Sequence, residues 1–576
     1  MNTVQNDKHV TQAEHAALER ILNVYFRENV KYTVQPKSEA WHIPLNDDET
    51  ISGTFMYWSN VGHHVYHPDI HLVNHTDKQS ISAMTAIEKL FEAFTAQANT
   101  QQTENHTHQH AIFEDIKNSI QRTARYLEHR GDLRNEGPYI ESEQSLYLGH
   151  PFHPTPKSAK GFTDADLERY APECHTAFQL HYLSIDTALM HARYVDGCES
   201  HAAQMLLALA ACTTADLAHG YALLPVHPYQ MGVLQQQPAF QEAMRQGRIK
   251  DLGQRGTYVY PTSSVRTVFS KVHNIYLKLP IKVKITNFVR TNNEEQLART
   301  LDAAEVIATL KAQYETSDFK LMFEEGYRAM QQLEDTEDFD LLANTGMIIR
   351  EGIEDYAEDK EIHVLASLFE TMPHRFESQL GQLFEQSGWH WTAWLDRYLE
   401  ITLRPMLNLF AETGISLEAH VQNTLVSFEQ GVPSVCYVRD LEGISISETI
   451  GTEAGLIPRI VASHSPVVDE HETAWHRFKY YIIVNHLGHF IATLGKATQC
   501  EEDHWAHVHE TLQRWLSEAD HPALIRCIQD LVQSPTFSAK ANFKSKLEDC
   551  SETPIYVDMP NPIYINKEEA KHDQCV

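Results

Sequence analysis

Residues 258–290 constrain the fold most strongly, because they read as strands rich in Val, Ile, Thr and Tyr. Residues 11–26 before them and 299–333 after them show helical periodicity instead. No regular alternation of strand, helix and strand is visible along the chain, nor any repeat of fixed period. The sequence therefore predicts an α+β protein.

The same stretch is a basic island in an acidic chain. Residues 261–290 contain no Asp or Glu, whereas the whole chain of 576 residues carries a net charge of −31. The basic residues of the island are Arg266, Lys271, Lys278, Lys282, Lys284 and Arg290. Because so acidic a protein repels nucleic acids and anionic lipids, we expect no nucleic acid and no membrane as partners. A local basic patch can still hold a small anion.

Strand periodicity predicts how the island presents its charges. Alternate residues of a strand point to opposite faces, so residues 281–290 would have one apolar face and one largely polar face. The second face comprises Lys282, Lys284, Thr286, Phe288 and Arg290, and Ser264 and Arg266 would share a face of a neighbouring strand. Hydroxyls beside Arg and Lys suit a nucleotide triphosphate or a polycarboxylate. The alternative is a solubilising face that pairs with acids elsewhere.

A second polar group lies within residues 417–440, which read as two strands joined by the turn EQGVP. This predicted hairpin would bring together Glu418, His420, Gln422, Asn423 and Asp440. Carboxylate oxygens are ligands of Mg²⁺, which takes one or two of them together with substrate phosphates. His420 could serve as a hydrogen-bond donor or as a general base. The alternative is a sheet edge with satisfied polar side chains.

Other segments are less specific. Three prolines in the loop GHPFHPTPKSAKGF, residues 149–162, forbid a helix and would hold His153 and Lys157 rigidly. The polar stretch 96–110 reads as a loop and a first domain boundary, and the acidic stretch 334–340 reads as a surface near a second one. The cysteines lack C-x-x-C spacing, and neither a signal peptide nor a membrane-spanning run is visible. We expect a soluble protein of a reducing compartment.

Several common catalytic motifs are absent or broken. Gly488 and Lys496 lie in a stretch that lacks both the spacing and the Ser or Thr of a P-loop. His471 and His476 are too far apart to share the face of a zinc-protease helix. Neither G-x-S-x-G nor a G-x-G-x-x-G after a strand is present, so a hydrolase or a dinucleotide-binding dehydrogenase is unsupported.

Seven motifs in order resemble a known family. They are GHPFHPTPKSAKGF, LLPVHPYQ, YPTSSVRT, KVKITNFVRT, SLEAHVQNTL, VRDLEG and SAKAN. Together they run from about residue 140 to the C-terminus and are far more specific than any single one. The chain resembles the IucA/IucC family, the siderophore synthetases that work without nonribosomal peptide synthetases. It is most similar to the citrate-using members.

The resemblance implies an ATP-dependent ligase. A citrate carboxylate attacks the α-phosphate of Mg-ATP, which gives an acyl adenylate and pyrophosphate. An amine such as 2,3-diaminopropionate, or a hydroxyl, then displaces AMP and forms a citryl amide or ester. The resemblance also implies a cytoplasmic homodimer shaped like a cupped hand. Its parts would be a thumb at residues 1–145, fingers with an antiparallel sheet at 146–345 and a kinase-like palm at 346–576.

The resemblance assigns roles to residues of this chain. The implied contacts to phosphate and citrate are Ser264, Arg266, Thr267, Thr286 and Arg290. His420, in the H-x-Q-N motif with Gln422 and Asn423, would lie near the reacting carboxylate. The implied metal and nucleotide neighbours are Glu418 and Asp440, and His153 and Lys157 match a loop that closes over the nucleotide. Further citrate or phosphate contacts would be Arg477 and Lys540.

Three alternatives stay open at this point. A small-molecule kinase would also use the polar hairpin, and it would release ADP rather than AMP and pyrophosphate. A synthetase of the same family could act on 2-oxoglutarate or on a citryl monoamide. A non-enzymatic binder of citrate or ferric chelates would use the basic island and the many histidines without consuming ATP.

Overall fold

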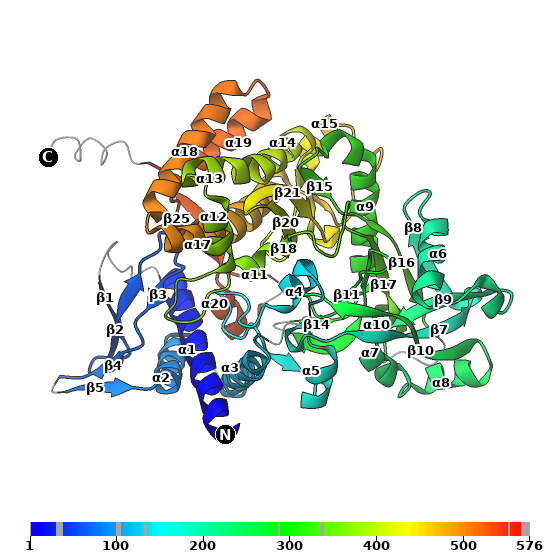
Figure 1. Ribbon diagram of the computed structural model, residues 1–576, viewed down its shortest axis with the longest axis horizontal. Helices are drawn as coiled ribbons and strands as arrows, with labels where there is room; N and C mark the ends of the chain where they lie inside the picture. Colours follow the sequence, from blue (N-terminus) through cyan, green and yellow to red (C-terminus); the bar gives the residue numbers. More distant parts are fainter. Residues whose placement is uncertain are drawn as a thin grey trace.

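The computed structural model describes residues 2–29, 39–75, 77–98, 105–131, 135–285, 288–333, 339–550 and 553–565. It is a mixture of helices and strands, which confirms the prediction of an α+β protein at this level. Figure 1 shows N-terminal elements in blue at the left, a large sheet at the right, and the helices of the C-terminal half at the top.

The N-terminal part packs three helices together beside a small sheet. The helices are α1 (Asn2–Glu28), α2 (Ala83–Ala98) and α3 (Asn105–Glu128). The sheet has the order β1 (Ala40–Pro44), β2 (Thr50–Tyr57), β4 (Ile70–Val73) and β5 (Lys78–Ile81), with β3 (Val65–Tyr66) also paired to β2. The predicted apolar stripe of the first helix is buried at Leu18, Ile21, Leu22 and Tyr25.

The expectation of a loop over residues 96–110 is wrong for most of its described part. α2 extends to Ala98, and α3 already begins at Asn105. The stripe of Ile112, Ile116 and Ile120 buries one face of α3, and this packing continues the helix into the polar residues before it. The residues between the two helices lie outside the described ranges.

The largest sheet within the described residues has eight strands. In sheet order its strands are β8 (Met190–Tyr194), β16 (Glu324–Met330), β17 (Met347–Glu351), β12 (Ile275–Lys278), β11 (Thr267–Ser270), β10 (Ile249–Pro261), β7 (Phe178–Asp186) and β9 (Tyr221–Val226). Every neighbouring pair in this sheet is antiparallel. α9 (Glu294–Tyr314) packs against β16 and begins with a capping box between Asn293 and Gln296.

The prediction of one continuous strand over residues 281–290 is wrong, because the segment folds back on itself. β13 (Ile281–Ile285) and β14 (Phe288–Arg290) form an antiparallel pair, and β6 (Ala159–Lys160) pairs with β13 on its other side. Within β13 the predicted alternation holds, since Ile281 and Val283 are buried while Lys282 and Lys284 are exposed.

The C-terminal half combines a four-stranded sheet with many helices. The sheet has the order β15 (Phe319–Leu321), β21 (Val432–Val438), β20 (Thr424–Glu429) and β18 (Ile362–Val364). A smaller sheet contains β19 (Ile415–Ser416), β22 (Ser445–Ser447) and β23 (Val468–Asp469). The main helices of this half are α11 (Leu365–Phe369), α12 (Gln379–Ser387), α13 (Trp391–Ile401), α14 (Leu403–Thr413), α16 (His471–Phe478), α17 (Gly488–Thr498), α18 (Glu501–Glu518) and α19 (Pro522–Gln533). The helix α4 (Pro138–Gln144) precedes the eight-stranded sheet in the sequence.

Strand pairing crosses one of the predicted domain boundaries, the one at residue 345. The eight-stranded sheet extends to Glu351, past the predicted boundary at residue 345. β15, from the predicted second domain, pairs in parallel with β21 of the predicted third domain. The division into three domains stays a prediction.

The two ends of the chain meet in one core. α20 (Asn542–Leu547) packs against α1 and α3, and Phe543 belongs to the hydrophobic core of the N-terminal part. The backbone amides of Phe543 and Lys544 donate to the carboxylate of Glu28, both at 2.9 Å. β24 (Thr536–Lys540) and β25 (Tyr556–Pro560) form a hairpin on either side of α20. The structure therefore closes its N-terminal core with its C-terminal residues.

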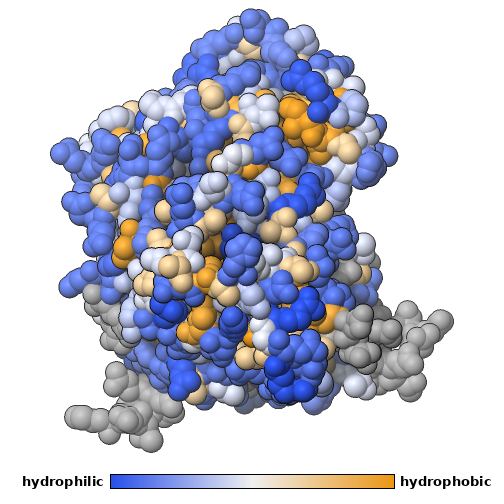
Figure 2. Space-filling view, turned by 90° about the vertical axis from the view of Figure 1, so that its right-hand side faces the viewer, coloured by the Kyte–Doolittle hydropathy of each residue, from blue (hydrophilic) through white to orange (hydrophobic). Residues whose placement is uncertain are grey.

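The surface agrees with the acidic composition. On the face that Figure 2 shows, hydrophilic side chains dominate and apolar ones gather in small separate patches. No described helix combines the length and the apolar character that crossing a membrane requires. The seven cysteines within the described ranges are all free thiols.

Candidate active site

Ser264 and Arg266 lie in the turn between β10 and β11, so the prediction that they share a strand face is wrong. Hydrogen bonds close the turn from Thr262 N to Thr267 O and from Val265 N to Thr262 O, both at 2.8 Å. Val265 has a φ of 68°, a left-handed conformation that is costly for a β-branched residue. This strained turn directs the Arg266 side chain, which is only 6% exposed, into the protein.

Arg266 belongs to a group of opposed charges that we call the ionic cluster. Its members are the cations Arg266, Lys278, Arg290 and Arg350 and the acids Glu324, Asp440 and Glu442. The Lys278 ammonium lies 2.7 Å from Asp440 Oδ1 and 2.8 Å from Glu442 Oε2. Arg350 lies between Glu324 at 2.8 Å and Asp440 at 3.3 Å, and Arg266 lies 3.9 Å from Glu442. Four cations thus face three carboxyl groups, which favours a further anion.

The pKa shifts show which members of the ionic cluster are compensated. Burial would raise the pKa of Asp440, but Lys278 and Arg350 hold it well below its usual range. Burial and the neighbouring Arg266 charge together lower the pKa of Arg290 to about 10. Burial also lowers the pKa of Arg266 itself, despite Glu442. Arg266 and Arg290 are therefore the cations that an incoming anion would stabilise most.

The prediction of a strand over residues 417–423 is also wrong, because these residues form a loop before β20. Side chains bind the local backbone there: Gln422 N donates to His420 Nδ1 at 3.2 Å, and Asn423 Nδ2 donates to the Glu418 carbonyl at 3.1 Å. Such bonds replace the ladder of a sheet. Asp440 likewise follows β21 with a φ of 71° and faces the ionic cluster from a turn.

The hydrogen bond at Nδ1 decides what His420 can do. Burial lowers the pKa of His420, although Glu418 and Asp440 oppose the shift, so the ring is neutral near pH 7. Since Nδ1 accepts a backbone N–H, the single proton of the neutral ring sits on Nε2. Nε2 lies 4.0 Å from Glu418 Oε1. In this state His420 can donate a hydrogen bond from Nε2. The sequence left two roles open, hydrogen-bond donor and general base, and the geometry favours the donor.

Gln422 connects the H-x-Q-N motif to the turn that carries Arg266. Its Nε2 donates to the Ser263 carbonyl at 2.9 Å across 159 residues of sequence. The Arg439 guanidinium supports this contact, because Nη2 donates to the Gln422 carbonyl at 3.0 Å while Nη1 pairs with buried Glu143. Glu143 also accepts the Ser263 N–H at 2.9 Å. These hydrogen bonds thus fix the H-x-Q-N motif and the turn that carries Arg266 relative to one another, although the two lie far apart in sequence.

A second set of predicted residues lies beside the ionic cluster, and we call it the His420 group: Glu418, His420, Arg477 and Lys540. Glu418 packs so closely on Gly443 that a Cβ there would lie 1.6 Å from its Oε2. Lys540 lies 5.1 Å from the centre of the Tyr480 ring, and burial lowers its pKa while Glu418 opposes the shift. Arg477 lies 3.6 Å from Asp469. The charges of Arg477 and Glu418 both act on Lys540, which places them near one another.

The remaining predicted residues are placed less directly. Thr286 lies outside the described residues. Thr267 is the cross-strand neighbour of Lys278, and the Ser264 hydroxyl accepts the Thr267 N–H at 3.2 Å. His153 is buried, with its Nδ1 bound to Thr155 N at 3.1 Å, and Lys157 is paired with buried Glu173. In this structure Lys157 is therefore already compensated.

The two carboxylates predicted as magnesium ligands, Glu418 and Asp440, differ in how well they suit that role. The carboxylate of Glu418 has no Lys or Arg within 4.0 Å among the described residues, so its oxygens can take a cation. Both oxygens of Asp440 instead face cations, Lys278 at one and Arg350 at the other. Ligation of a metal by Asp440 would require these contacts to change. The donor set does not form a ready two-carboxylate site.

Sequence reasoning missed several residues that the structure brings to this place. Lys278 was only one of six basic residues in the island, and nothing in the sequence marked Arg350 or Glu324. Arg299 donates to the carbonyls of Glu442 and Ile444, at 2.6 and 2.8 Å, and so fixes the loop after Asp440. The one signal that could have marked Lys278 as a site residue is the antiparallel hairpin of β11 and β12, which places it opposite Thr267.

Comparisons with known proteins place the chain in a family. Residues 138–370 match the model of the IucA / IucC family, and residues 392–555 match a model described as ferric iron reductase FhuF-like transporter. The L-2,3-diaminopropanoate–citrate ligase of Staphylococcus aureus (strain NCTC 8325 / PS 47) is 54% identical over 98% of both chains. The spermidine–citrate ligase of Bacillus anthracis is 27% identical over 74% of this chain and 73% of its own.

A solved structure supports the same conclusion. The ATP-bound aerobactin synthetase IucA from a hypervirulent pathotype of Klebsiella pneumoniae has a TM-score of 0.86 and 25% sequence identity, over 96% of this chain and 100% of that one. The match to a ligase that is 54% identical covers 98% of the chain, and the resemblance drawn from seven motifs is confirmed. The chain belongs to the IucA/IucC family.

Proposed function

We propose that this protein is an ATP-dependent siderophore synthetase that joins citrate to an amine, with L-2,3-diaminopropionate as the amine. The observation that carries the proposal is the identity of 54%, over 98% of both chains, to an L-2,3-diaminopropanoate–citrate ligase. The geometry supports it, because the ionic cluster and the His420 group together suit a polyanion. The ATP-bound relative supports the use of ATP.

In the proposed first step an oxygen of a citrate carboxylate attacks the α-phosphorus of ATP. The new P–O bond gives citryl adenylate, and pyrophosphate leaves. Arg266 and Arg290 neutralise phosphate and carboxylate charge, since they are the least compensated cations of the ionic cluster. His420 donates its Nε2–H to a carboxylate oxygen and orients the nucleophile. Lys540 and Arg477 hold the other carboxylates of citrate.

In the proposed second step the amine attacks the acyl carbon of citryl adenylate. A C–N bond forms, AMP leaves with the electron pair of the C–O bond, and the amine loses a proton. Such chemistry depends on positioning and charge neutralisation rather than on a protein nucleophile. This agrees with the absence of a recognisable Ser-His-Asp motif from the sequence.

Finer features of the family belong to the same proposal. We infer a homodimer in the cytoplasm, where ATP is available, and a cupped hand whose thumb, fingers and kinase-like palm enclose the site. Mg²⁺ would bind with ATP, and Glu418 is the carboxylate best placed to approach it. Ser264, Thr267, Thr286, Gln422, Asn423, His153 and Lys157 complete the proposed nucleotide and citrate contacts.

The experiment that tests the function traps the acyl adenylate with hydroxylamine. The purified protein is incubated with Mg-ATP, hydroxylamine and citrate, 2-oxoglutarate, succinate or no acid, and hydroxamate, pyrophosphate and ADP are measured. We expect hydroxamate and pyrophosphate with citrate alone. A signal with 2-oxoglutarate instead would change the substrate, and ADP without pyrophosphate would indicate a kinase.

The amine is tested in the same assay without hydroxylamine. L-2,3-diaminopropionate, ornithine and spermidine are offered with citrate, and the condensed product is identified by mass spectrometry. We expect L-2,3-diaminopropionate to give the highest kcat/KM. A clear preference for another amine would refute this part of the proposal and leave the adenylation intact.

A further inference from the structure

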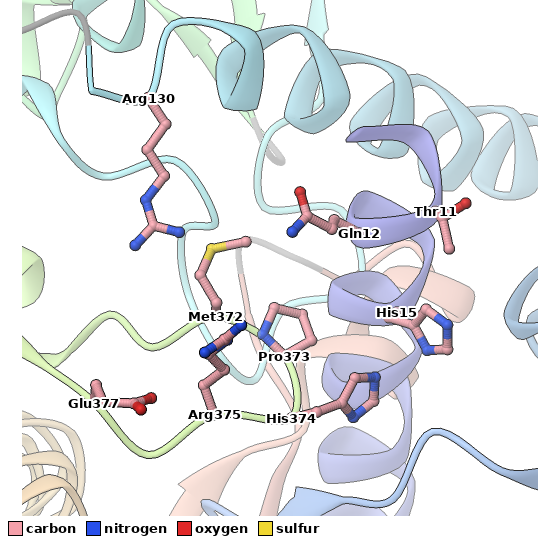
Figure 3. A pocket seen from close by; sticks show the side chains of 9 residues that line it. All are labelled: Thr11, Gln12, His15, Arg130, Met372, Pro373, His374, Arg375 and Glu377. Carbon is pink, nitrogen blue, oxygen red and sulfur yellow. The ribbon is translucent and has the colours of Figure 1, made fainter. Parts of the chain in front are cut away.

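A cavity of about 580 Å³ lies away from the candidate active site. Three parts of the chain form it: α1, Arg130 just after α3, and the segment 372–377 between α11 and α12. None of the residues proposed for catalysis or for binding of ATP and citrate lines it. Figure 3 shows the guanidinium groups of Arg130 and Arg375 approaching the middle of the cavity from opposite sides, with Gln12 pointing toward it from α1.

The two arginines lack acidic partners. Among the described residues, no Asp or Glu oxygen lies within 4.0 Å of either guanidinium. Arg125, in the last turn of α3, shows the contrast, because it binds Glu168 at 2.7 Å. Glu377 also lines the cavity, so two guanidiniums face one carboxylate there. Arg is the side chain best suited to carboxylate recognition, so the cavity favours a ligand with at least two carboxylates.

The histidines at the edge of the cavity indicate a second chemical group that a ligand of the cavity would carry. The rings of His15 and His374 meet edge to face at 4.7 Å, and burial lowers the pKa of both. His374 Nδ1 lies 2.7 Å from the Tyr66 carbonyl, so it carries the proton and Nε2 is an acceptor. Nε2 is buried and has no hydrogen-bond partner in the described part of the chain. It suits a hydroxyl group of a ligand.

The same elements that line the cavity also hold the His-Pro loop of residues 149–162. α1 carries Arg27, whose guanidinium lies 3.1 Å from the centre of the Phe152 ring. The segment 372–377 follows Glu370, whose carboxylate accepts the backbone N–H of Leu148, just before the loop, at 2.8 Å and that of Gly149, its first residue, at 3.3 Å. A ligand that draws α1 and this segment together therefore acts on both supports of the loop.

We propose that this cavity is a second, regulatory site that binds a small hydroxylated polycarboxylate and alters the affinity of the active site for ATP. Citrate and its amides belong to this chemical class, and this identification of the effector rests on the proposed function. The coupling is mechanical, through α1 and Glu370 to the His-Pro loop, and it is reciprocal: ATP changes the affinity of the cavity by the same factor.

Binding is tested by calorimetry with citrate, on full-length protein without ATP. Arg266→Ala removes a cation of the proposed citrate site, and we expect this variant still to bind citrate. Adding Arg130→Ala and Arg375→Ala should weaken that binding at least about tenfold. Arg245→Ala, which removes an exposed guanidinium elsewhere, should leave it unchanged. Tricarballylate, which lacks the hydroxyl of citrate, should bind more weakly.

Three results would overturn the site: no citrate binding by Arg266→Ala, binding that ignores Arg130 and Arg375, or equally tight binding of inorganic sulfate. Because both arginines are exposed, we expect their variants to fold, and thermal unfolding checks this. The binding test needs no turnover, so it decides on the cavity even if the hydroxamate assay fails.

Regulation is tested by the KM for ATP over a wide range of citrate concentration. Above saturation of the active site, we expect citrate to shift this KM by about fivefold or more in the wild type. Arg130→Ala/Arg375→Ala should keep kcat at low citrate and lose the shift, whereas Arg245→Ala should keep both. An identical dependence on citrate in the wild type and the double variant would refute the regulatory role.

Discussion

Replacing Lys278 with Met tests the energetics of the ionic cluster. The ammonium group is buried, with the residue 5% exposed, and it lies within 2.8 Å of both Asp440 and Glu442. Met keeps the length of the side chain but leaves two buried carboxylates without this cation. Removing one partner of a buried ion pair costs about 3–5 kcal/mol. We expect the free energy of unfolding to fall by about this amount near neutral pH.

The size of this loss depends on pH with a definite sign. Burial opposes ionisation of Asp440 and Glu442, but Lys278 together with the neighbouring arginines lowers the pKa of both, so both carboxylates contribute stability above their ordinary pKa values. That stability is lost as the pH falls through the lowered values of the folded protein. In the variant the pKa of both groups rises. The destabilisation should therefore be full near neutral pH and shrink as the pH approaches about 4.

The assay is urea unfolding followed by tryptophan fluorescence, at neutral and at acidic pH. Lys282→Met is the matched control, because Lys282 is exposed and four residues further along; it should change stability by less than about 0.5 kcal/mol. Adding Asp440→Asn and Glu442→Gln to Lys278→Met should restore part of the stability, since it removes the two carboxylates that lost this cation, while Arg350 keeps Glu324 and Arg266 keeps its bonds to Thr291 and Asn292. An unfolding curve of Lys278→Met that matches the wild type at neutral pH would refute the reasoning.

Three further predictions concern the reaction. Arg266→Ala should lower citrate-dependent pyrophosphate release at least about tenfold, the equivalent of one charge-assisted pair, in a protein that still folds; near wild-type release would contradict its role. Because burial lowers the pKa of His420, kcat/KM should show no inflection from this group between about pH 8 and 6.5 and should fall only below, a loss absent from His420→Gln. Gln422→Ala frees the turn at Ser263 and should raise the KM for ATP more than it lowers kcat, and a change in kcat alone would argue against a positioning role.

Much of the fold could be predicted where one period dominates a segment. The stripe of the first helix and the alternation in β13 both match the structure, because each segment packs one face on a core. The helix α3 was missed at its start, since composition alone suggested a loop. The apolar residues that hold this helix lie later, at Ile112 and Ile116.

The failures within the candidate site have a common cause. Residues 417–423 alternate like a strand, yet the side chains of His420 and Asn423 capture backbone groups and form a loop. Residues 281–290 also alternate, but the chain turns back after Ile285, with Phe288 as its cross-strand partner. Periodicity does not detect a polar side chain that binds its own backbone, or two halves of an alternating segment that pair with each other.

The ion pairs of the ionic cluster could not be predicted from the sequence, for a different reason. Lys278 and Asp440 are 162 residues apart, and only the meeting of β12 with the turn after β21 brings them together. The basic island was visible as a local excess of charge, but its partners were not. The sequence could therefore indicate an anion site, whereas the balance of four cations and three carboxyl groups required the structure.

The closure of the N-terminal core by α20 has a consequence for synthesis on the ribosome. The core around α1 needs Phe543, and the Glu28 carboxylate needs the amides of Phe543 and Lys544. At about 5–20 residues per second, roughly 20–80 s of translation separates the release of α3 from that of α20. The nascent chain must carry an unsealed apolar surface throughout this interval, so a premature stop codon even near the end would release a polypeptide whose beginning is misfolded.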